Sequence, residues 1–334
     1  CGRSLARTPG RGYLRPMIRP IVVFGTWLVL VPQPVAAQSP DSLLGSESED
    51  AEYRVYTGHG VPSSLEEILA AARWTDVLLI GEEHDDMVGH RLEEKILERL
   101  IAGSGETQTE ARRVILSLEM FERDVQYVMD EYLEGLITED HFLDSTRPWD
   151  DYHDRYRGVV ELAKANGVRI IAANAPRRYV NRVTREGPES LDALSPQARG
   201  FLPPLPYPGP SDAYRAQWDS IMAQVRRATP EPSDTATHDP QAAREEEREY
   251  PRNPNALLAQ ALWDAAMGHA VVQAVRRGGG DLVFHMAGSF HVEKGTGIPE
   301  LIEDFRPGTA VVTVVMTKSE DTDAWSAESH EGLA

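Results

Sequence analysis

The sequence contains a single cysteine, Cys1, among its 334 residues. No disulfide can therefore form within the chain, and no cluster of thiolates can hold a metal ion. Basic residues are also few, since 34 lysines and arginines stand against 53 acids and the formal net charge is -19. Because binding to phosphates needs a basic face, this balance argues against a nucleic-acid partner. Aromatic residues make up only 7 %, but the 41 % of hydrophobic residues suffices for a core.

The first 37 residues differ from the rest of the chain. They contain arginines but no acid, then an apolar run from Ile21 to Val31, then small residues at Val35 and Ala37. This order is typical of a secretory signal peptide with an upstream extension, and it predicts cleavage after Ala37. The apolar run is shorter than the roughly 20 residues that span a bilayer comfortably. We expect an exported protein of the periplasm or cell envelope; the alternative is an uncleaved segment that associates the chain with the membrane.

The remaining chain divides by composition. Residues 38–52 are polar and predict a linker, and residues 318–334 predict a disordered tail. The domain between them, residues 53–317, contains a polar stretch rich in proline and glutamate at about 229–253, which we interpret as a flexible insertion.

Apolar runs of strand length alternate with helical patterns along this domain. After a short first strand at 53–56, the expected strands are 77–80, 114–118, 168–173, 282–287 and 310–316. Four expected helices span 90–101, 123–133, 152–165 and 254–276. A further helix is expected to end near residue 73, and another to begin at Pro176. This alternation predicts a three-layer α/β fold, in which helices cover both faces of a mainly parallel central sheet.

Polar residues gather where these strands end. In open parallel sheets, ligands bind beyond the carboxyl ends of the strands. Four of the expected strands are followed by Gly81-Glu82-Glu83-His84, by Glu119, by Asn174 with Arg177, and by Gly288-Ser289-Phe290-His291. In the two Gly-x-x-His turns, glycine permits a sharp turn and a close approach of the backbone. We therefore predict one site at this edge of the sheet.

Two kinds of chemistry suit these residues. Two neutral imidazoles and a carboxylate form a divalent metal site with open positions, so His84, Glu119 and His291 are the predicted metal ligands. Such a site activates water for the hydrolysis of an amide or ester, with Glu82, Glu83 and Glu119 as the candidate catalytic carboxylates. The same histidines are also suited to contact haem, and the residues alone leave both alternatives open.

Two further residues are predicted to assist the site. Asp264 projects from a mainly apolar face of the helix at 254–276, and a buried carboxylate needs a partner, so it is predicted to orient a site histidine or arginine. Arg177 opens a helix whose N-terminus favours anions, so it is predicted to bind a carboxylate of a substrate or haem. The alternatives are that Asp264 lies at the exposed edge of the apolar helix face, and that Arg177 pairs with acids on the surface. His90, near the start of its helix, is interpreted as structural.

The ordered set of these motifs resembles the ChaN-like haem-binding uptake family of the Tiki superfamily. The matching segments are Leu79 to Asp85, Ser117 to Phe121, Ile171 to Arg177, the pair Asp264 and Met267, and Ala287 to His291. Together they extend the resemblance over residues 53–317 apart from the insertion.

The resemblance implies a three-layer α/β fold, a bacterial envelope protein, and a role in haem or iron acquisition. It places His84, Glu119 and His291 on the superfamily's site, with Glu82 in the same motif. The cofactor-binding residues are then His84, His291, Asn174, Arg177 and Asp264, and the cofactor is haem or a divalent metal ion. The wider superfamily includes metal-dependent proteases and relatives of erythromycin esterase, so the alternative is a hydrolase that acts on a peptide or small-molecule ligand. The sequence leaves open whether the chain forms a homodimer, or is a scaffold that keeps the site as a relic.

Overall fold

The structure is a computed structural model that describes residues 52–103, 112–228, 253–319, 321–323, 325–326 and 330. The predicted signal peptide and almost all of the predicted linker precede residue 52, and the predicted insertion coincides with the gap at 229–252. These three predictions therefore lie almost wholly outside the described residues, and everything described belongs to one compact unit, residues 48–334.

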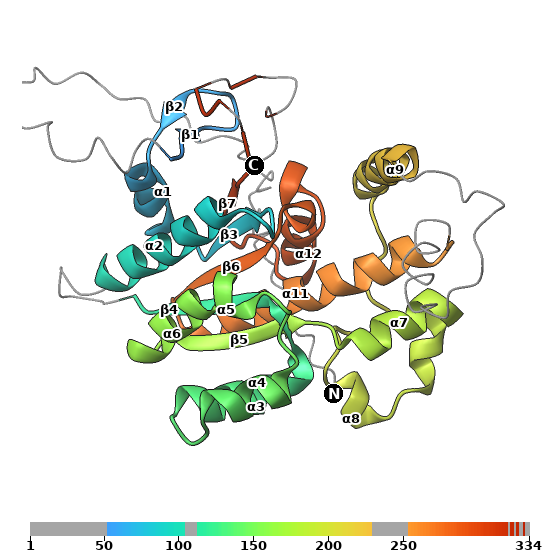
Figure 1. The fold of residues 1–334 in the computed structure, drawn as a ribbon. Helices are drawn as coiled ribbons and strands as arrows, with labels where there is room; N and C mark the ends of the chain where they lie inside the picture. The colour runs from blue at the N-terminus through green and yellow to red at the C-terminus, as the bar shows by residue number, and fades with distance from the viewer. Residues whose placement is uncertain are drawn as a thin grey trace, which may run out of the picture. The chain divides into compact units, whose positions relative to one another are not determined.

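A five-stranded parallel sheet forms the centre of this unit (Figure 1). Its strands are β3 (Val77–Glu82), β4 (Val114–Glu122), β5 (Arg169–Asn174), β6 (Leu282–Gly288) and β7 (Val311–Val315), in the spatial order β5-β4-β6-β3-β7. Every residue of β3 and β6 is buried, as continuous apolar runs predict for strands covered on both faces. A separate antiparallel pair joins β1 (Val55–Tyr56) to β2 (Pro62–Ser63).

Two groups of helices cover the two faces of the sheet. One face packs against α1 (Leu65–Ala72), α2 (Met87–Gly103), α3 (Gln126–Leu133), α4 (Glu139–Thr146), α5 (Tyr152–Arg155) and α6 (Arg157–Ala165). The other face packs against α11 (Ala256–Gly278) and α12 (Ile298–Phe305). Figure 1 shows α11 as the long helix that crosses the sheet. The three-layer α/β fold with a parallel sheet is thus confirmed.

Three further helices lie near the amino-terminal end of α11. They are α7 (Arg177–Glu186), α8 (Pro196–Arg199) and α9 (Asp212–Ala228). The amino-terminal half of α11 buries Ala259, Leu262 and Ala266 against α7. The sequence pattern does not predict α4, α8, α9 or α12; of these, α4, α8 and α12 are too short to make a long periodic pattern, whereas α9 has 17 residues.

The strand order makes neighbouring connections diverge at the carboxyl edge of the sheet. The chain leaves β3 and β4 toward α2 and α3, but it leaves β6, which lies between them, toward α12 on the opposite face. Connections that diverge from neighbouring strands open a space beyond the strand ends, where ligands bind in sheets of this kind. The residues that follow β3, β4 and β6 are therefore the ones brought together.

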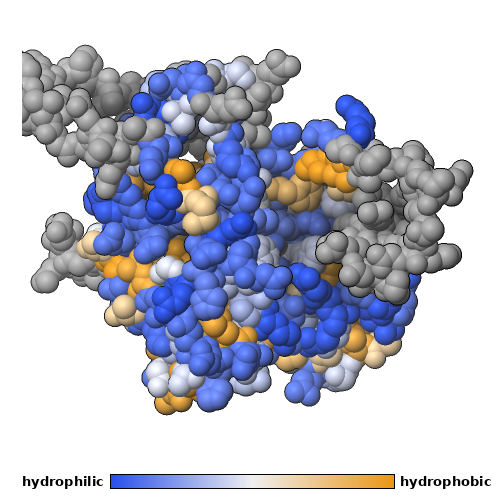
Figure 2. Space-filling model, in the orientation of Figure 1, coloured by the Kyte–Doolittle hydropathy of each residue, from blue (hydrophilic) through white to orange (hydrophobic). Residues whose placement is uncertain are grey.

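The surface agrees with the acidic composition. In the orientation of Figure 1, most of the described surface is hydrophilic and the hydrophobic patches are scattered (Figure 2). Within the described parts of the chain, no helix is long and apolar enough to cross a membrane. Several described residues beyond 317 contact the amino-terminal hairpin or the β3 loop: Asp323 pairs with Arg54, and Lys318 lies 2.6 Å from Asp85.

Candidate functional site: two histidine–carboxylate networks

His84 lies just beyond β3 and is tied to a buried carboxylate. Its Nδ1 donates to Glu82 Oε1 at 2.8 Å, and Tyr156 donates its hydroxyl to the same oxygen at 2.9 Å. The His84 side chain is 44 % exposed, whereas the Glu82 side chain is 1 % exposed. The ring meets Trp149 edge-on, with 4.8 Å between centroids. A fixed Nδ1–H leaves Nε2 as the nitrogen available to a ligand.

His291 is held in a similar way on the opposite face of the sheet. It closes the 3₁₀ turn η6 (Ser289–His291) after β6, and its Nδ1 donates to Asp264 Oδ1 on α11. Tyr214 of α9 donates its hydroxyl to the other oxygen of Asp264. Asp264 is therefore buried and paired with His291, as expected for a carboxylate on an apolar helix face, and its role in a functional site stays a prediction.

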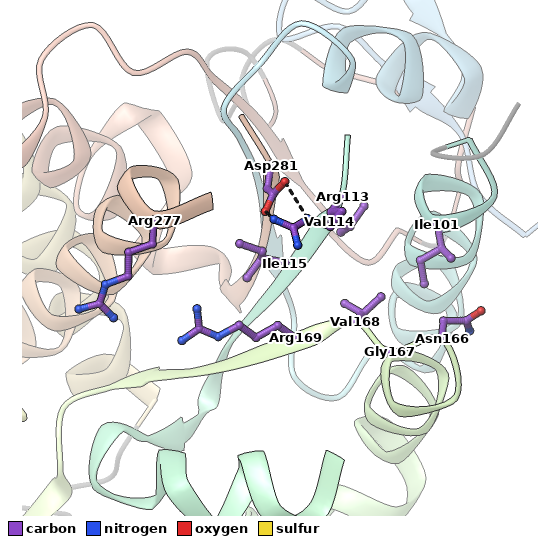
Figure 3. Close-up of a pocket in the computed structure, with 10 residues that line it drawn as sticks. All are labelled: Ile101, Arg113, Val114, Ile115, Asn166, Gly167, Val168, Arg169, Arg277 and Asp281. Carbon is purple, nitrogen blue, oxygen red and sulfur yellow. Dashed lines mark hydrogen bonds and ion pairs between the residues drawn. The ribbon is translucent and has the colours of Figure 1, made fainter. Parts of the chain in front are cut away.

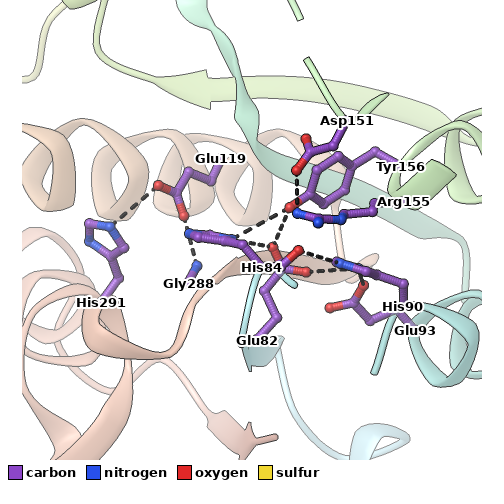
Figure 4. A network of polar contacts seen from close by, with 10 residues as sticks. All are labelled: Glu82, His84, His90, Glu93, Glu119, Asp151, Arg155, Tyr156, Gly288 and His291. Atoms are coloured by element: carbon purple, nitrogen blue, oxygen red, sulfur yellow. Dashed lines mark hydrogen bonds and ion pairs between the residues drawn. The ribbon is translucent and has the colours of Figure 1, made fainter. Parts of the chain in front are cut away.

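Glu119 of β4 contacts one of the two histidines and lies near the other. Its Oε1 lies 3.3 Å from His291 Nε2, and its Oε2 accepts the backbone N–H of Gly288 at 2.7 Å. Figure 4 shows Glu119 between His291 and His84. The structure thus brings together Glu82, His84, Glu119, Asp264 and His291, all of which the sequence placed at one edge.

The charges of these groups reinforce one another. Burial disfavours a charged His291, but the negative charges of Asp264 and Glu119 outweigh it and hold the pKa of His291 well above its ordinary value. Burial also opposes the charge of His84, yet the hydrogen bond to Glu82 and the charge of Glu119 raise the pKa of His84. Burial disfavours the Glu82 carboxylate as well, but hydrogen bonds with His84 and His90 lower the pKa of Glu82 to about 2. The site therefore favours imidazolium–carboxylate pairs when no ligand competes for the nitrogens.

The glycines of the two turns are required for space rather than for an unusual backbone. Gly288 has φ −57°, and neither Gly81 nor Gly288 has a positive φ. A Cβ on Gly288 would lie 2.9 Å from His84 Nε2 and 3.7 Å from His291 Cδ2, so both rings approach the same point. A Cβ on Gly81 would overlap a methyl group of Val292. The expected close approach is present, but the expected sharp turn is not what selects glycine.

Alanine at these two glycines is predicted to have different effects. Gly81→Ala should destabilise the fold by about 1–3 kcal/mol, because its Cβ would overlap buried Val292 and approach the backbone of Ser289. Gly288→Ala should cost less stability and displace His84, since the atoms it meets end a half-exposed side chain. Urea unfolding of both variants, with the NMR signals of the His84 ring as a local readout, checks this. Equal stabilities for Gly81→Ala and the parent protein would contradict it.

Three other predicted residues lie near the edge but point elsewhere. Glu83 accepts the backbone N–H of Lys318 at 2.9 Å and lies 3.4 Å from its Nζ. Asn174 turns its side-chain oxygen to the backbone N–H of Ala175, at 2.8 Å. Arg177 begins α7 with its side chain exposed. None of the three makes a hydrogen bond to His84, Glu119 or His291 within the described part of the chain, so their catalytic or cofactor-binding roles stay predictions.

Some partners of these residues come from distant segments and do not follow from the sequence pattern. Tyr156 is 72 residues from His84, and Tyr214 is 50 residues from Asp264. On α2, His90 and Glu93 contact each other, and their i, i+3 spacing places them on one helix face. That spacing, with one acid and one histidine, is the local signal that could have drawn attention to Glu93.

A cavity of about 330 Å³ lies away from these residues, at the amino ends of β4 and β5. Figure 3 shows Arg169 and Arg277 along it, and Arg113 paired with Asp281 at 3.1 Å. None of the predicted site residues lines this cavity. It therefore does not contribute to the histidine–carboxylate site.

The nitrogen and oxygen atoms that could ligate a metal at the carboxyl edge fit either haem iron or a divalent ion. Both histidines donate Nδ1–H to a carboxylate, an arrangement that orients a metal-ligating imidazole and makes its Nε2 more basic. His84 is exposed enough for a large ligand to reach, whereas the His291 side chain is only 7 % exposed. His84 is thus suited to ligate haem iron. A small ion could instead be ligated by His84 together with His291 and Glu119.

Fold and site define a three-layer α/β protein with a histidine–carboxylate site at the carboxyl edge of its parallel sheet. The model of the family described as haem-binding uptake, Tiki superfamily, ChaN matches residues 68–302, and the chain belongs to this family. The resemblance inferred from the sequence is thereby confirmed.

Individual relatives are distant. A solved structure described as "Cofacial heme binding to ChaN of Campylobacter jejuni" is similar with a TM-score of 0.57 and 18 % identity, over 81 % of this chain and 93 % of that one. At this identity, the likeness shows the fold alone. The curated protein RETICULATA-RELATED 5, chloroplastic, from Arabidopsis thaliana is 24 % identical over 213 residues. That alignment covers 61 % of this chain and 26 % of the relative, so the chain spans about a quarter of the relative's length.

Proposed function

We propose that this protein binds haem at the carboxyl edge of its sheet, with His84 as the iron ligand, and serves haem or iron uptake. The observation that supports this most directly is the exposed His84 ring whose Nδ1 is held by buried Glu82. Imidazole is a common ligand of haem iron, and a carboxylate behind it tunes its basicity. Membership of the family supports the same ligand class, and so does the haem binding for which the ChaN structure from Campylobacter jejuni is named.

A titration with haemin tests this proposal. The folded full chain should show a saturable change in the Soret band, and His84→Ala should weaken binding at least about tenfold because the iron loses its ligand. Replacement of the exposed His141 on α4 is the matched control and should leave binding unchanged. Free imidazole should restore part of the His84→Ala spectrum. A folded protein that gives no saturable change, or a His84→Ala variant that binds like the parent, would contradict the proposal.

A second candidate function is metal-dependent hydrolysis of a peptide or ester. It is favoured by the approach of His291 Nε2 to Glu119 Oε1 at 3.3 Å, next to the His84 ring. Two imidazoles and a carboxylate can bind an ion that lowers the pKa of a bound water, and Glu82 or Glu119 would then take its proton. Metal analysis and a panel of peptides and esters test it. Hydrolysis that survives both chelation and His291→Ala would exclude this function.

We also propose that the protein works outside the cytoplasm. The support is the signal-peptide pattern of residues 1–37, which lies outside the described residues. Sequencing the amino terminus of the natively produced protein should find cleavage after Ala37. An intact apolar segment from Ile21 to Val31 would instead favour membrane association through that segment. Sedimentation of the same sample would decide whether it forms a homodimer.

A further inference from the structure

A separate cluster of metal-ligating side chains lies beneath His84, on the α2 face of the sheet. The atoms that could bind a metal ion are Glu82 Oε2 at the end of β3, and His90 Nδ1 and Glu93 Oε2 on α2 (Figure 4). His90 Nδ1 lies 3.2 Å from the Glu82 oxygen and 3.0 Å from the Glu93 oxygen. All the ligand atoms lie within 4.8 Å of one another, and no side chain is more than 3 % exposed.

The orientation of His90 determines what can lie between these groups. Its Nε2 donates to the backbone carbonyl of His84 at 3.0 Å, so a neutral ring presents the lone pair of Nδ1 to two carboxylates. All three atoms are then acceptors, and a cation between them satisfies the geometry; without one, a proton on His90 Nδ1 takes that place, since burial opposes the charge but Glu82 and Glu93 raise the pKa of His90. In addition, Glu82 Oε2 and Glu93 Oε1 are buried without a hydrogen-bond partner among the described residues. Buried acceptors of this kind require a proton or a cation.

We propose that Glu82, His90 and Glu93 form a buried site for a divalent transition-metal ion, with zinc as the best fit. Two ligands of a tetrahedral zinc ion with bonds near 2.0 Å lie about 3.3 Å apart, close to the distances around His90 Nδ1. Imidazole and carboxylate are both zinc ligands. Calcium needs six to eight oxygens and magnesium a nearly octahedral shell, which two carboxylates and one imidazole do not provide.

The surrounding contacts hold the three ligands in place. The carbonyl of His84 fixes the His90 tautomer, and Glu82 Oε1 receives hydrogen bonds from His84 and Tyr156 while Oε2 faces the site. Contacts behind the ligands, like these, orient metal-binding side chains. Glu82 therefore links the two sites: one oxygen faces the buried ion, and the other holds His84. The buried site goes beyond the proposed haem function and does not depend on it.

Zinc titration of the full chain against a chromogenic chelator tests the site. The parent protein should bind one zinc ion at the buried position, and Glu93→Gln and His90→Gln should each weaken that binding at least about tenfold. Glu94→Gln, the neighbouring exposed glutamate on α2, is the matched control and should bind like the parent. Zinc should also raise the thermal midpoint of the parent and Glu94→Gln proteins but not that of Glu93→Gln.

Two further measurements separate this site from the outer one. His291→Asn disrupts the outer site and should still bind one Co²⁺, with the visible absorption of a four-coordinate nitrogen–oxygen site. Glu93→Gln should still give the Soret change with haemin, so the failure of either proposal is recognisable without the other. The His291→Asn measurement also remains informative if the α2 variants do not fold. Zinc binding that Glu93→Gln leaves unchanged, zinc or Co²⁺ binding that His291→Asn abolishes, or a folded parent that binds neither ion would overturn the inference.

Discussion

Replacement of Asp264 by alanine is expected to lower the free energy of unfolding by about 3–5 kcal/mol, as the removal of one partner from a buried ion pair does. Asp264 is 1 % exposed and accepts hydrogen bonds from His291 and Tyr214. Without it, the His291 ring must lose its proton or keep a buried charge balanced by Glu119 but no longer by Asp264, and the Tyr214 hydroxyl loses an acceptor. Asp264→Asn keeps the shape and one acceptor, so its cost should be smaller.

The pH dependence of this effect has a defined sign. Burial opposes the charge of His291, but Asp264 and Glu119 raise its pKa well above 6.5, its ordinary value. A raised histidine pKa contributes stability that is fully present below about pH 6.5 and is lost as the pH rises toward the folded-state value. The difference between the parent and Asp264→Ala should therefore be larger at pH 6 than at pH 9.

Urea unfolding at both pH values, with a chelator present, measures the effect. The exposed Asp304 on α12 supplies the control, because its replacement by alanine removes an acid that is not buried. The control should change stability by less than about 0.5 kcal/mol. An Asp264→Ala protein within about 1 kcal/mol of the parent at pH 6 would show that the His291 pair contributes little to stability.

The rule that ligands bind beyond the carboxyl ends of parallel strands predicted which residues lie close together better than it predicted their contacts. The apolar runs identified β3, β4, β5 and β6, and parallel strands bring their carboxyl ends to one edge. Glu82, His84, Glu119 and His291 follow from that rule alone. However, Asn174 and Arg177 also follow from it, and their side chains turn to Ala175 and to solvent. The rule identifies an edge, but the direction of each side chain depends on local backbone geometry.

The residues that contact Glu82 from other elements could not be predicted from the sequence, for a different reason. His90 and Glu93 reach Glu82 only because α2 packs against β3, and Tyr156 reaches Glu82 only because the segment around α5 and α6 covers the same face. Neither packing arrangement leaves a periodic signal in the chain. Asp264 is the exception, since a carboxylate on an apolar helix stripe indicates a buried partner before that partner is known.

His285 is expected to make the protein sensitive to mild acid. It lies in β6, the central strand, where its Nδ1 is 2.9 Å from Ser117 Oγ and its Nε2 is buried without a partner among the described residues. Burial lowers the pKa of His285 to about 4, against an ordinary value of 6.5. Between these values the unfolded chain binds a proton that the folded chain does not, so stability falls as the pH falls.

Since each pH unit changes the contribution of one group by about 1.4 kcal/mol, the loss from His285 reaches about 3 kcal/mol between pH 6.5 and pH 4. His285→Asn, which keeps a polar group near Ser117 but does not titrate, should remove most of that slope. Its free energy of unfolding at pH 7 should be lower than that of the parent, because the smaller side chain leaves a cavity, and the two curves should converge toward pH 4. Urea unfolding at half-unit pH intervals gives both slopes. Parallel curves would assign the acid sensitivity to other groups, of which the half-buried His269, with its pKa lowered to about 4 by burial, is the next to replace.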